Sequence, residues 1–316
     1  FTSSAPTVAV GDSVTVTGTV VEFRGSTPSL TITEIGSPVV TIVSSGNPLP
    51  TAVIVGTGGR VPPTMVIDDD ATGDVETSGT FDATTDGIDF YESMEHMRVQ
   101  VNNPVVVGPT NDFGEVWVLG DDGANASVRT TRGGIVIRPG DFNPERIQLD
   151  DSLADTPDVN VGDHLSGPAI GVLDYSFNNF EVLVTQPLTR VAGPIARETT
   201  MPQGANQIAI STFNVENLDP TDGQAKFDGL ASTIVNNLKS PDILSLEEVQ
   251  DNNGPGAGGV DASQTYMSLT LAIQSAGGPQ YQYRQIDPVN NQDGGEPNGN
   301  IRVAFLFRTD RGVAFV

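Results

Sequence analysis

Two stretches of the chain end in polar side chains that could hold a metal ion. Residues 207–213 alternate apolar and polar side chains, as a strand does, and are followed by Asn214 and Glu216. Residues 242–246 form a short apolar run typical of a buried strand, and Glu248 follows it two residues later. Carboxylate oxygens are ligands that Mg²⁺ and Ca²⁺ prefer in proteins. The two stretches together indicate a candidate site for a divalent metal ion.

A predicted helix over residues 228–239 joins the two stretches. Leu230, Ile234 and Leu238 fall on one side at helical spacing, and Pro241 ends the helix. A helical crossover of this kind makes the flanking strands parallel neighbours. We therefore expect the polar residues that follow the two strands to lie side by side.

Three sequence motifs occur in order along this part of the chain. They are FNVENL at residues 213–218, PDILSLEEVQD at residues 241–251 and GGEPNGNIRVAFLFRTDR at residues 294–311. Together they resemble motifs of the endonuclease/exonuclease/phosphatase (DNase I-like) family. Within that family the chain is most similar to large secreted bacterial nucleases, which carry oligonucleotide-binding-like (OB-like) modules before the catalytic domain.

The resemblance implies a fold, an activity and a set of site residues. The fold would be mostly β in the N-terminal barrels or sheets, followed by a partial α/β domain of the four-layer α/β/β/α sandwich type. The activity would be metal-dependent phosphodiester hydrolysis of extracellular nucleic acid, DNA in preference to RNA. Asn214 and Glu248 match catalytic residues, and Glu248 and Glu216 match metal ligands, for Mg²⁺ or Mn²⁺ and also Ca²⁺. Glu247 stands beside them, and we expect no functional role for Arg302.

The chain also departs from the family pattern. The later motifs, an Asp-x-Asn pair and a Ser-Asp-His, do not occur, and no histidine follows His164. We therefore expect residues 206–316 to be the N-terminal half of a nuclease domain, with core positions such as Leu246 exposed unless something covers them. The alternative is a non-enzymatic binding or self-assembling extracellular module derived from such a nuclease.

The charge balance limits the partners of the protein. Among 316 residues, 15 Lys and Arg face 40 Asp and Glu, which gives a formal net charge of −25. Proteins that attract nucleic acid over a broad surface are normally basic, so DNA binding here would need bound cations or a local basic patch. No apolar run reaches membrane-spanning length. The chain opens at Phe1 without a Met, and we expect a processed, secreted or cell-surface product.

Most of the chain before the three motifs reads as β modules. Residues 8–23 alternate apolar and Ser or Thr positions, as half-buried strands do. We expect an OB-like module at residues 1–67, clipped inside its first strand at Phe1, and a second at residues 86–190. A Pro- and Gly-containing linker at residues 191–205 would separate them from the nuclease part.

A dense acidic run separates the two predicted modules. Within residues 68–85, Asp68, Asp70 and Asp74 surround a glycine and form a candidate calcium loop. The run does not follow the EF-hand pattern, and a solvated acidic loop is the alternative.

One concentration of basic residues stands out in the acidic chain. Arg129, Arg132 and Arg138 occur close together, and Trp117 precedes them. Arginines and an aromatic ring could form a groove for single-stranded nucleic acid. The alternative is that the arginines pair with the surplus of Asp and Glu.

Overall fold

The computed structural model describes residues 6–316 and divides the chain into two compact units, Phe1–Ile195 and Ala196–Val316. The chain is mostly β, with 30% of it in strands and 12% in helices, as the sequence predicts. The break between the units falls inside the stretch predicted as a linker. The expectation for Phe1 lies outside the described residues. Each unit has a hydrophobic core of its own, so each is described separately.

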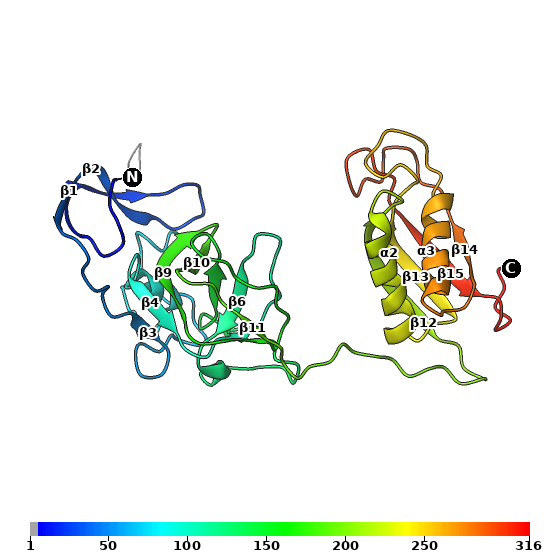
Figure 1. The fold of residues 1–316 in the computed structure, drawn as a ribbon, viewed down its shortest axis with the longest axis horizontal. Coiled ribbons are helices and arrows are strands. Elements are labelled where there is room, and N and C mark those ends of the chain that lie inside the picture. The colour runs from blue at the N-terminus through cyan, green and yellow to red at the C-terminus, as the bar shows by residue number, and fades with distance from the viewer. Residues whose placement is uncertain (1–5) are drawn as a thin grey trace. The chain divides into compact units, whose positions relative to one another are not determined.

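The first unit contains a two-stranded sheet and a nine-stranded sheet (Figure 1). The small sheet pairs β1 and β2 as an antiparallel hairpin. The large sheet has the strand order β11-β8-β5-β6-β7-β10-β9-β4-β3. The strands are β1 (Ser13–Phe23), β2 (Ile32–Ser44), β3 (Val53–Val55), β4 (Arg98–Val101), β5 (Val105–Val106), β6 (Val116–Leu119), β7 (Ile147–Asp150), β8 (His164–Leu165), β9 (Ala169–Ser176), β10 (Asn179–Val184) and β11 (Arg190–Val191).

Residues 6–67 do not form a barrel module of their own. Every residue of β1 is exposed, and β3 pairs with β4, which belongs to the large sheet. The structure therefore has no domain boundary at residue 67, where the sequence predicted one. The reason is that β3 is short and is buried only against the next module. Besides these strands the first unit has a short helix, α1 (Gly87–Glu92), and one 3₁₀ turn (Asp121–Gly123).

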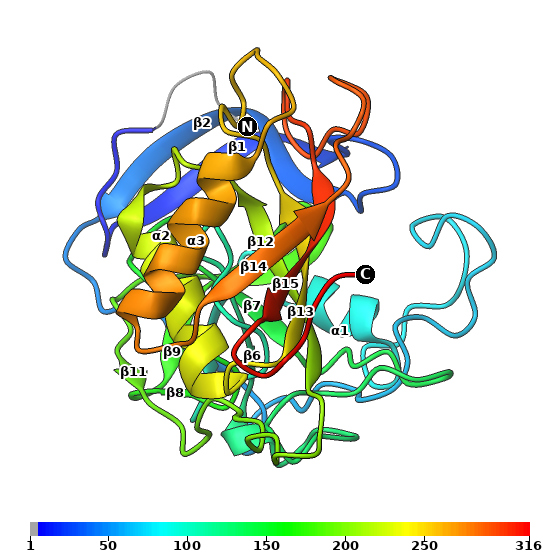
Figure 2. The ribbon, with the colours of Figure 1, turned by 90° about the vertical axis from the view of Figure 1, so that its right-hand side faces the viewer.

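The second unit is a four-stranded sheet with two helices on one face (Figures 1 and 2). The strand order is β12-β13-β15-β14, and β12 and β13 are parallel. Helix α2 runs into a π-helical turn (Thr233–Asn237) before the chain enters β13. The elements are β12 (Ile210–Leu218), α2 (Gly223–Ser232), β13 (Ile243–Val249), α3 (Ser263–Ser275), β14 (Tyr281–Gln285) and β15 (Arg302–Arg308).

The core of this unit lies between the sheet and the helices. Leu244, Leu246 and Leu306 are fully buried and pack with residues of α2 and α3. Positions like Leu246 are therefore covered, and it is the two helices that cover them. The opposite face of the sheet is uncovered instead: Ile210 is 70% and Phe305 is 49% exposed.

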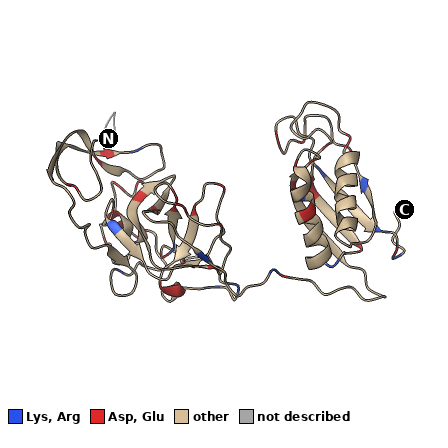
Figure 3. Ribbon diagram, viewed as in Figure 1, with Lys and Arg blue, Asp and Glu red and all other residues tan. Residues whose placement is uncertain are grey.

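Neither unit contains a helix, among residues 6–316, that is long and apolar enough to cross a membrane. Acidic positions outnumber basic ones in the ribbon of both units (Figure 3).

Candidate functional site

The candidate site lies on the parallel strands β12 and β13, at Asn214 in the middle of β12 and Glu248 near the end of β13. The register places Asn214 opposite Glu247, and the regular pairing stops there. The side-chain amide of Asn214 donates from Nδ2 to Oε1 of Glu248 at 2.6 Å. The structure thus brings together the two residues that the sequence predicts to be catalytic.

Unusual backbone geometry forms this contact. The strand predicted at residues 207–213 extends further than its sequence pattern, because β12 continues to Leu218 and carries an irregularity in its register. Glu216 (φ +55°) and Glu248 (φ +61°) have left-handed backbones. Such conformations are costly for non-glycine residues and are often found at functional sites. Val215 and Leu218 on the bulged strand stay fully buried, which anchors the irregular segment.

Glu216 is linked to the pair through its backbone. Its N–H donates to Oδ1 of Asn214 at 2.7 Å, and its carbonyl accepts from Nζ of Lys226 at 2.7 Å. Because Oδ1 of Asn214 accepts from Glu216, the NH₂ end of the amide faces Glu248. The bond to Glu216 therefore fixes the orientation of the side chain that holds the Glu248 carboxylate.

Glu247 belongs to a separate contact. Its Oε1 accepts a hydrogen bond from the Thr212 hydroxyl on the neighbouring strand. Its side chain is exposed. Glu247 is therefore next to Glu248 in sequence, but its hydrogen bond is made with Thr212 and not with the Asn214–Glu248 pair.

A buried polar network holds the loops next to the site. Gln250 and Asn300 are fully buried, and Oε1 of Gln250 accepts from the backbone N–H of Asn300 at 2.7 Å. The Gln250 amide donates to Oδ1 of Asn217 at 3.0 Å, and the Asn300 amide donates to Asp251 at 2.6 Å. Sequence reasoning quoted Gln250 and Asp251 within a motif but gave them no role. Their signal is that the buried last residue of β13, Val249, is followed directly by two polar residues.

Arg302 anchors the same network from β15. Its side chain is 2% exposed and lies 3.2 Å from Asp287. It also donates to the carbonyl of Val260 at 2.6 Å and to Oε1 of Gln285 at 2.8 Å. These partners lie on different loops and strands, so Arg302 has a positioning role that the sequence did not reveal.

Glu296 is a further carboxylate in this part of the unit. Burial is the first cause that raises its pKa, and the charges of Asp219 and Asp222 add to the shift. Its Oε1 is buried without a hydrogen-bond partner within the protein.

Two groups of three carboxylates could each surround a metal ion within residues 6–316, and neither includes Glu216 or Glu248. Both groups lie in the first unit. The first consists of Asp68, Asp70 and Asp86, and the second of Glu115, Asp150 and Glu181. At the β12–β13 site, a metal ion would have to complete its ligand shell with water or substrate oxygens, which Mg²⁺ commonly does.

The predicted calcium loop differs from the structure at one residue. Asp68 and Asp70 gather with Asp86, and Asp74 is 3.2 Å from Arg24 in an ion pair. Sequence reasoning missed Asp86 because it is distant in the chain and follows a stretch without metal-ligand spacing.

The three arginines of the predicted nucleic-acid groove all interact with other groups of the protein. Arg129 donates to the carbonyls of Asp122 and Gly133 at 3.0 and 2.8 Å. Arg138 pairs with Asp141 at 2.9 Å, and Arg132 also has an interaction partner. Trp117 lies under a different arginine, Arg146, at 4.3 Å from the guanidinium carbon to the ring centre.

Comparison with known proteins adds one match. A family model described as a domain of unknown function (DUF8508) matches residues 53–193. The match lies within the first unit and covers less than half of the chain, and its description assigns no activity. No curated protein and no solved structure matches significantly.

Proposed function

We propose that the second unit binds a divalent metal ion and a nucleic-acid phosphate at the Asn214–Glu248 pair, as part of a metal-dependent phosphodiesterase. The substrate would be extracellular nucleic acid, DNA in preference to RNA, and the protein would act outside the cell or at its surface. The observation that supports this is the 2.6 Å hydrogen bond between Asn214 of β12 and Glu248 near the end of β13. These are the two residues at which the sequence resembles the catalytic pair of the DNase I-like family.

The donor atoms at the site fit Mg²⁺ or Mn²⁺. The Glu248 carboxylate of β13, and the Glu216 carboxylate two residues after Asn214 on β12, offer hard oxygen ligands at an exposed edge where water can fill other positions. A bound ion would stabilise negative charge on phosphate oxygens. Asn214 would hold the Glu248 carboxylate in one direction, and the Glu216 N–H would hold Asn214. Residues 196–316 contain no histidine, so the family's histidine base has no counterpart in this unit.

The test is cleavage of plasmid and single-stranded DNA by the full chain with Mg²⁺, Mn²⁺ or chelator. Glu248→Gln should lower the metal-dependent rate and the Mg²⁺ affinity by about 100-fold. Glu247→Gln is the matched control, because it removes the same charge one residue away and should leave both quantities nearly unchanged.

Two results would contradict the proposal. One is equal loss in the two variants, which would mean that acidity alone matters. The other is a wild-type chain that neither binds Mg²⁺ nor cleaves DNA.

The uncovered face of the second sheet favours a second candidate, a self-associating or binding module. Ile210, Val303 and Phe305 expose 70%, 54% and 49% of their surface on the face opposite the helices. Light scattering after size exclusion should then show oligomers that Phe305→Asp converts to monomers. A wild-type chain that is monomeric at high concentration would remove this candidate.

A further inference from the structure

The long connection between β3 and α1 is the most acidic part of the chain. Residues 68–92 hold nine Asp and Glu side chains and no Lys, Arg or His. Residues 56–86 form no strand or α-helix. Connections of this length without regular structure are uncommon in compact domains unless they serve a function.

Three carboxylates of this segment converge. One oxygen each from Asp68, Asp70 and Asp86 lie within 4.8 Å of one another. The geometry alone does not distinguish a metal site from a crowded acidic loop, because exposed acidic groups often cluster without an ion.

Asp86 distinguishes the two. Asp86 is 1% exposed, and its Oδ1 has no hydrogen-bond partner within the protein. Burial is the first cause that raises the pKa of Asp86, followed by the charges of Asp69 and Asp68. A buried carboxylate normally has a cation or hydrogen-bond donors as partners, because its desolvation is otherwise uncompensated. Here the groups that face it are other carboxylates.

The loop holds the other two carboxylates in place. Oδ1 of Asp68 accepts from the N–H of Ala71 at 2.8 Å. Both oxygens of Asp70 accept from the N–H of Thr80, at 3.1 and 3.0 Å. Gly79 (φ +92°) allows this approach, since a Cβ there would lie 2.5 Å from Oδ1 of Asp70. The backbone therefore orients two acidic groups toward a third, against their mutual repulsion.

We propose that Asp68, Asp70 and Asp86 bind one calcium ion. All three ligands are carboxylate oxygens, which hard cations prefer, and a spread of 4.8 Å corresponds to two Ca–O bonds of about 2.4 Å placed end to end. Irregular loops supply the ligands, and Ca²⁺ tolerates their flexible geometry better than Mg²⁺, which requires a near-ideal octahedron. The ion supplies the positive charge that no side chain of residues 68–92 provides.

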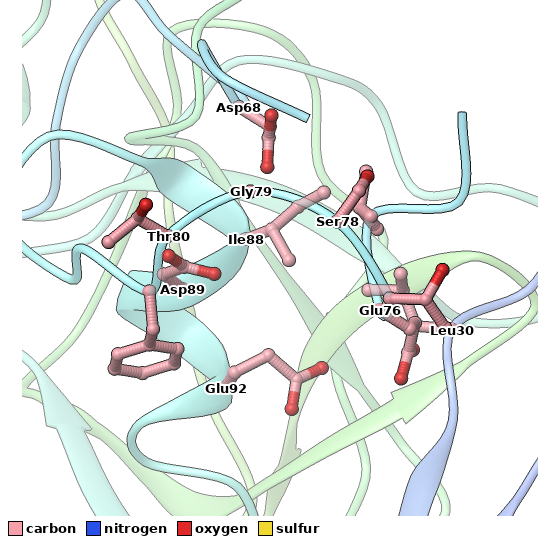
Figure 4. A pocket seen from close by; sticks show the side chains of 12 residues that line it. Leu30, Asp68, Glu76, Ser78, Gly79, Thr80, Ile88, Asp89 and Glu92 are labelled. Atoms are coloured by element: carbon pink, nitrogen blue, oxygen red, sulfur yellow. The ribbon is translucent and has the colours of Figure 1, made fainter. Parts of the chain in front are cut away.

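A cavity beside the three ligands has room for the water molecules that would complete the shell. Its volume is about 410 Å³, and Asp68 lines it together with Glu76, Asp89 and Glu92. Figure 4 shows Asp89 and Glu92 projecting from α1 into the same pocket as Asp68 and Glu76. Oε1 of Glu92 is also buried without a partner. The walls of the cavity are therefore suited to a hydrated cation.

The ion would also secure the N-terminal hairpin. Glu76, in the same loop, accepts from the N–H of Thr31 at 2.5 Å and from its hydroxyl at 2.6 Å. Asp74 pairs with Arg24 at 3.2 Å. Because the loop residues between the ligands attach the exposed β1–β2 hairpin, loss of the ion should loosen the hairpin as well as the loop.

Calorimetric titration of the metal-free full chain with CaCl₂ tests the proposal. The Asp86→Asn variant should bind one Ca²⁺ fewer than the wild type. Asp69→Asn is the matched control, because it removes the same charge from the same loop and should keep that equivalent. Glu248→Gln should keep it too, which separates this site from the one in the second unit. Asp70→Asn, at an exposed position, should also lose the ion and serves if Asp86→Asn does not fold.

Thermal unfolding gives a second test, because Ca²⁺ and chelator should change the melting temperatures of the wild type and Asp86→Asn differently. At about 100 times its dissociation constant, Ca²⁺ should raise the Tm of the wild-type first unit by about 5 °C and leave that of Asp86→Asn unchanged. In chelator, Asp86→Asn should melt above the wild type, because it removes a buried charge without a partner. In chelator, trypsin should cut the wild type at Arg24 faster than with Ca²⁺.

Three results would overturn the proposal. The first is an unchanged Ca²⁺ stoichiometry in Asp86→Asn and Asp70→Asn. The second is an equal loss in Asp69→Asn, which would indicate diffuse attraction to an acidic loop. The third is a wild-type chain that Ca²⁺ neither binds nor stabilises, which would mean that the carboxyl groups share protons instead.

Discussion

The two units differ in whether their buried polar atoms have hydrogen-bond partners within the protein. Among residues 6–316, six buried side-chain atoms lack a hydrogen-bond partner within the protein, and five of them lie in the first unit. They belong to Asp86, Glu92, Arg129, Glu145 and Gln148, and the sixth belongs to Glu296 in the second unit. In contrast, the buried Asp242 of the second unit pairs with Arg311 and accepts from the N–H of Ala209.

The difference indicates where each unit needs an external ion. In the second unit, protein donors such as Asn300, which donates to Asp251, and Arg311, which pairs with Asp242, compensate the buried charges, and the candidate metal site lies at an exposed edge. Binding there would serve chemistry rather than folding. In the first unit, the carboxylates of Asp86 and Glu92 each have a buried oxygen without such a donor, so a bound cation would contribute directly to stability.

The largest effect should follow from removing the best-paired buried charge. Arg302→Met should lower the Tm of the second unit by about 10 °C, roughly 3 kcal/mol, because it leaves the Val260 carbonyl without a donor and removes one of the two donors to Oε1 of Gln285. Differential scanning calorimetry measures this shift.

Arg284→Met is the control for Arg302→Met. Arg284 is exposed and lies over the rings of Phe307 and Phe315 at 5.5 and 5.2 Å. Its loss should cost about 1 kcal/mol or less. Equal destabilisation by the two variants would show that the pairing of buried charge does not distinguish the second unit.

An intermediate effect should come from a buried acid in the first unit. Burial raises the pKa of Glu181 to about 7, the Ser176 hydroxyl opposes the shift, and Asp150 and Asp174 add to it. The folded state therefore keeps a proton that the unfolded chain loses near pH 4.5. The stability contribution is complete at low pH and is lost as pH rises toward about 7, by at most about 1.4 kcal/mol per pH unit.

Glu181→Gln should flatten this pH dependence in urea titrations between pH 5 and 8. Asp112→Asn, at an exposed position, should retain the wild-type slope. If the slope survives in Glu181→Gln, another buried acid is responsible.

The smallest effect should come from the arginines of the first unit. Arg138 is half exposed and pairs with Asp141 at 2.9 Å. Partly exposed ion pairs contribute about 0–1 kcal/mol, so Arg138→Met should shift the Tm by only about 1–2 °C. Its affinity for single-stranded DNA, measured by fluorescence anisotropy, should stay within about twofold of the wild type. A larger loss of affinity would restore the predicted groove.

The sequence predicted those features that depend on local pattern. The helix predicted at residues 228–239 is present as α2 and the π-helical turn after it, beginning at Gly223, because apolar side chains there follow helical spacing. The meeting of Asn214 and Glu248 followed from a helical crossover, which brings parallel strand ends together.

Features that depend on contacts between distant segments were not predictable. Asp86 joins Asp68 and Asp70 only because a loop without periodicity folds back on α1. The pairing of β3 with β4 and the partners of Arg302 likewise depend on tertiary packing. In each case the sequence shows the residue types but no spacing that selects their partners.

The left-handed backbone of Glu248 has a consequence for how this position can evolve. At φ +61° a glycine would be more favourable than glutamate by about 1 kcal/mol. The carboxylate at this position therefore costs stability, and selection for stability alone would favour glycine. A library of variants at this position, sorted first for thermal resistance and then for function, should rank glycine and glutamate in opposite orders.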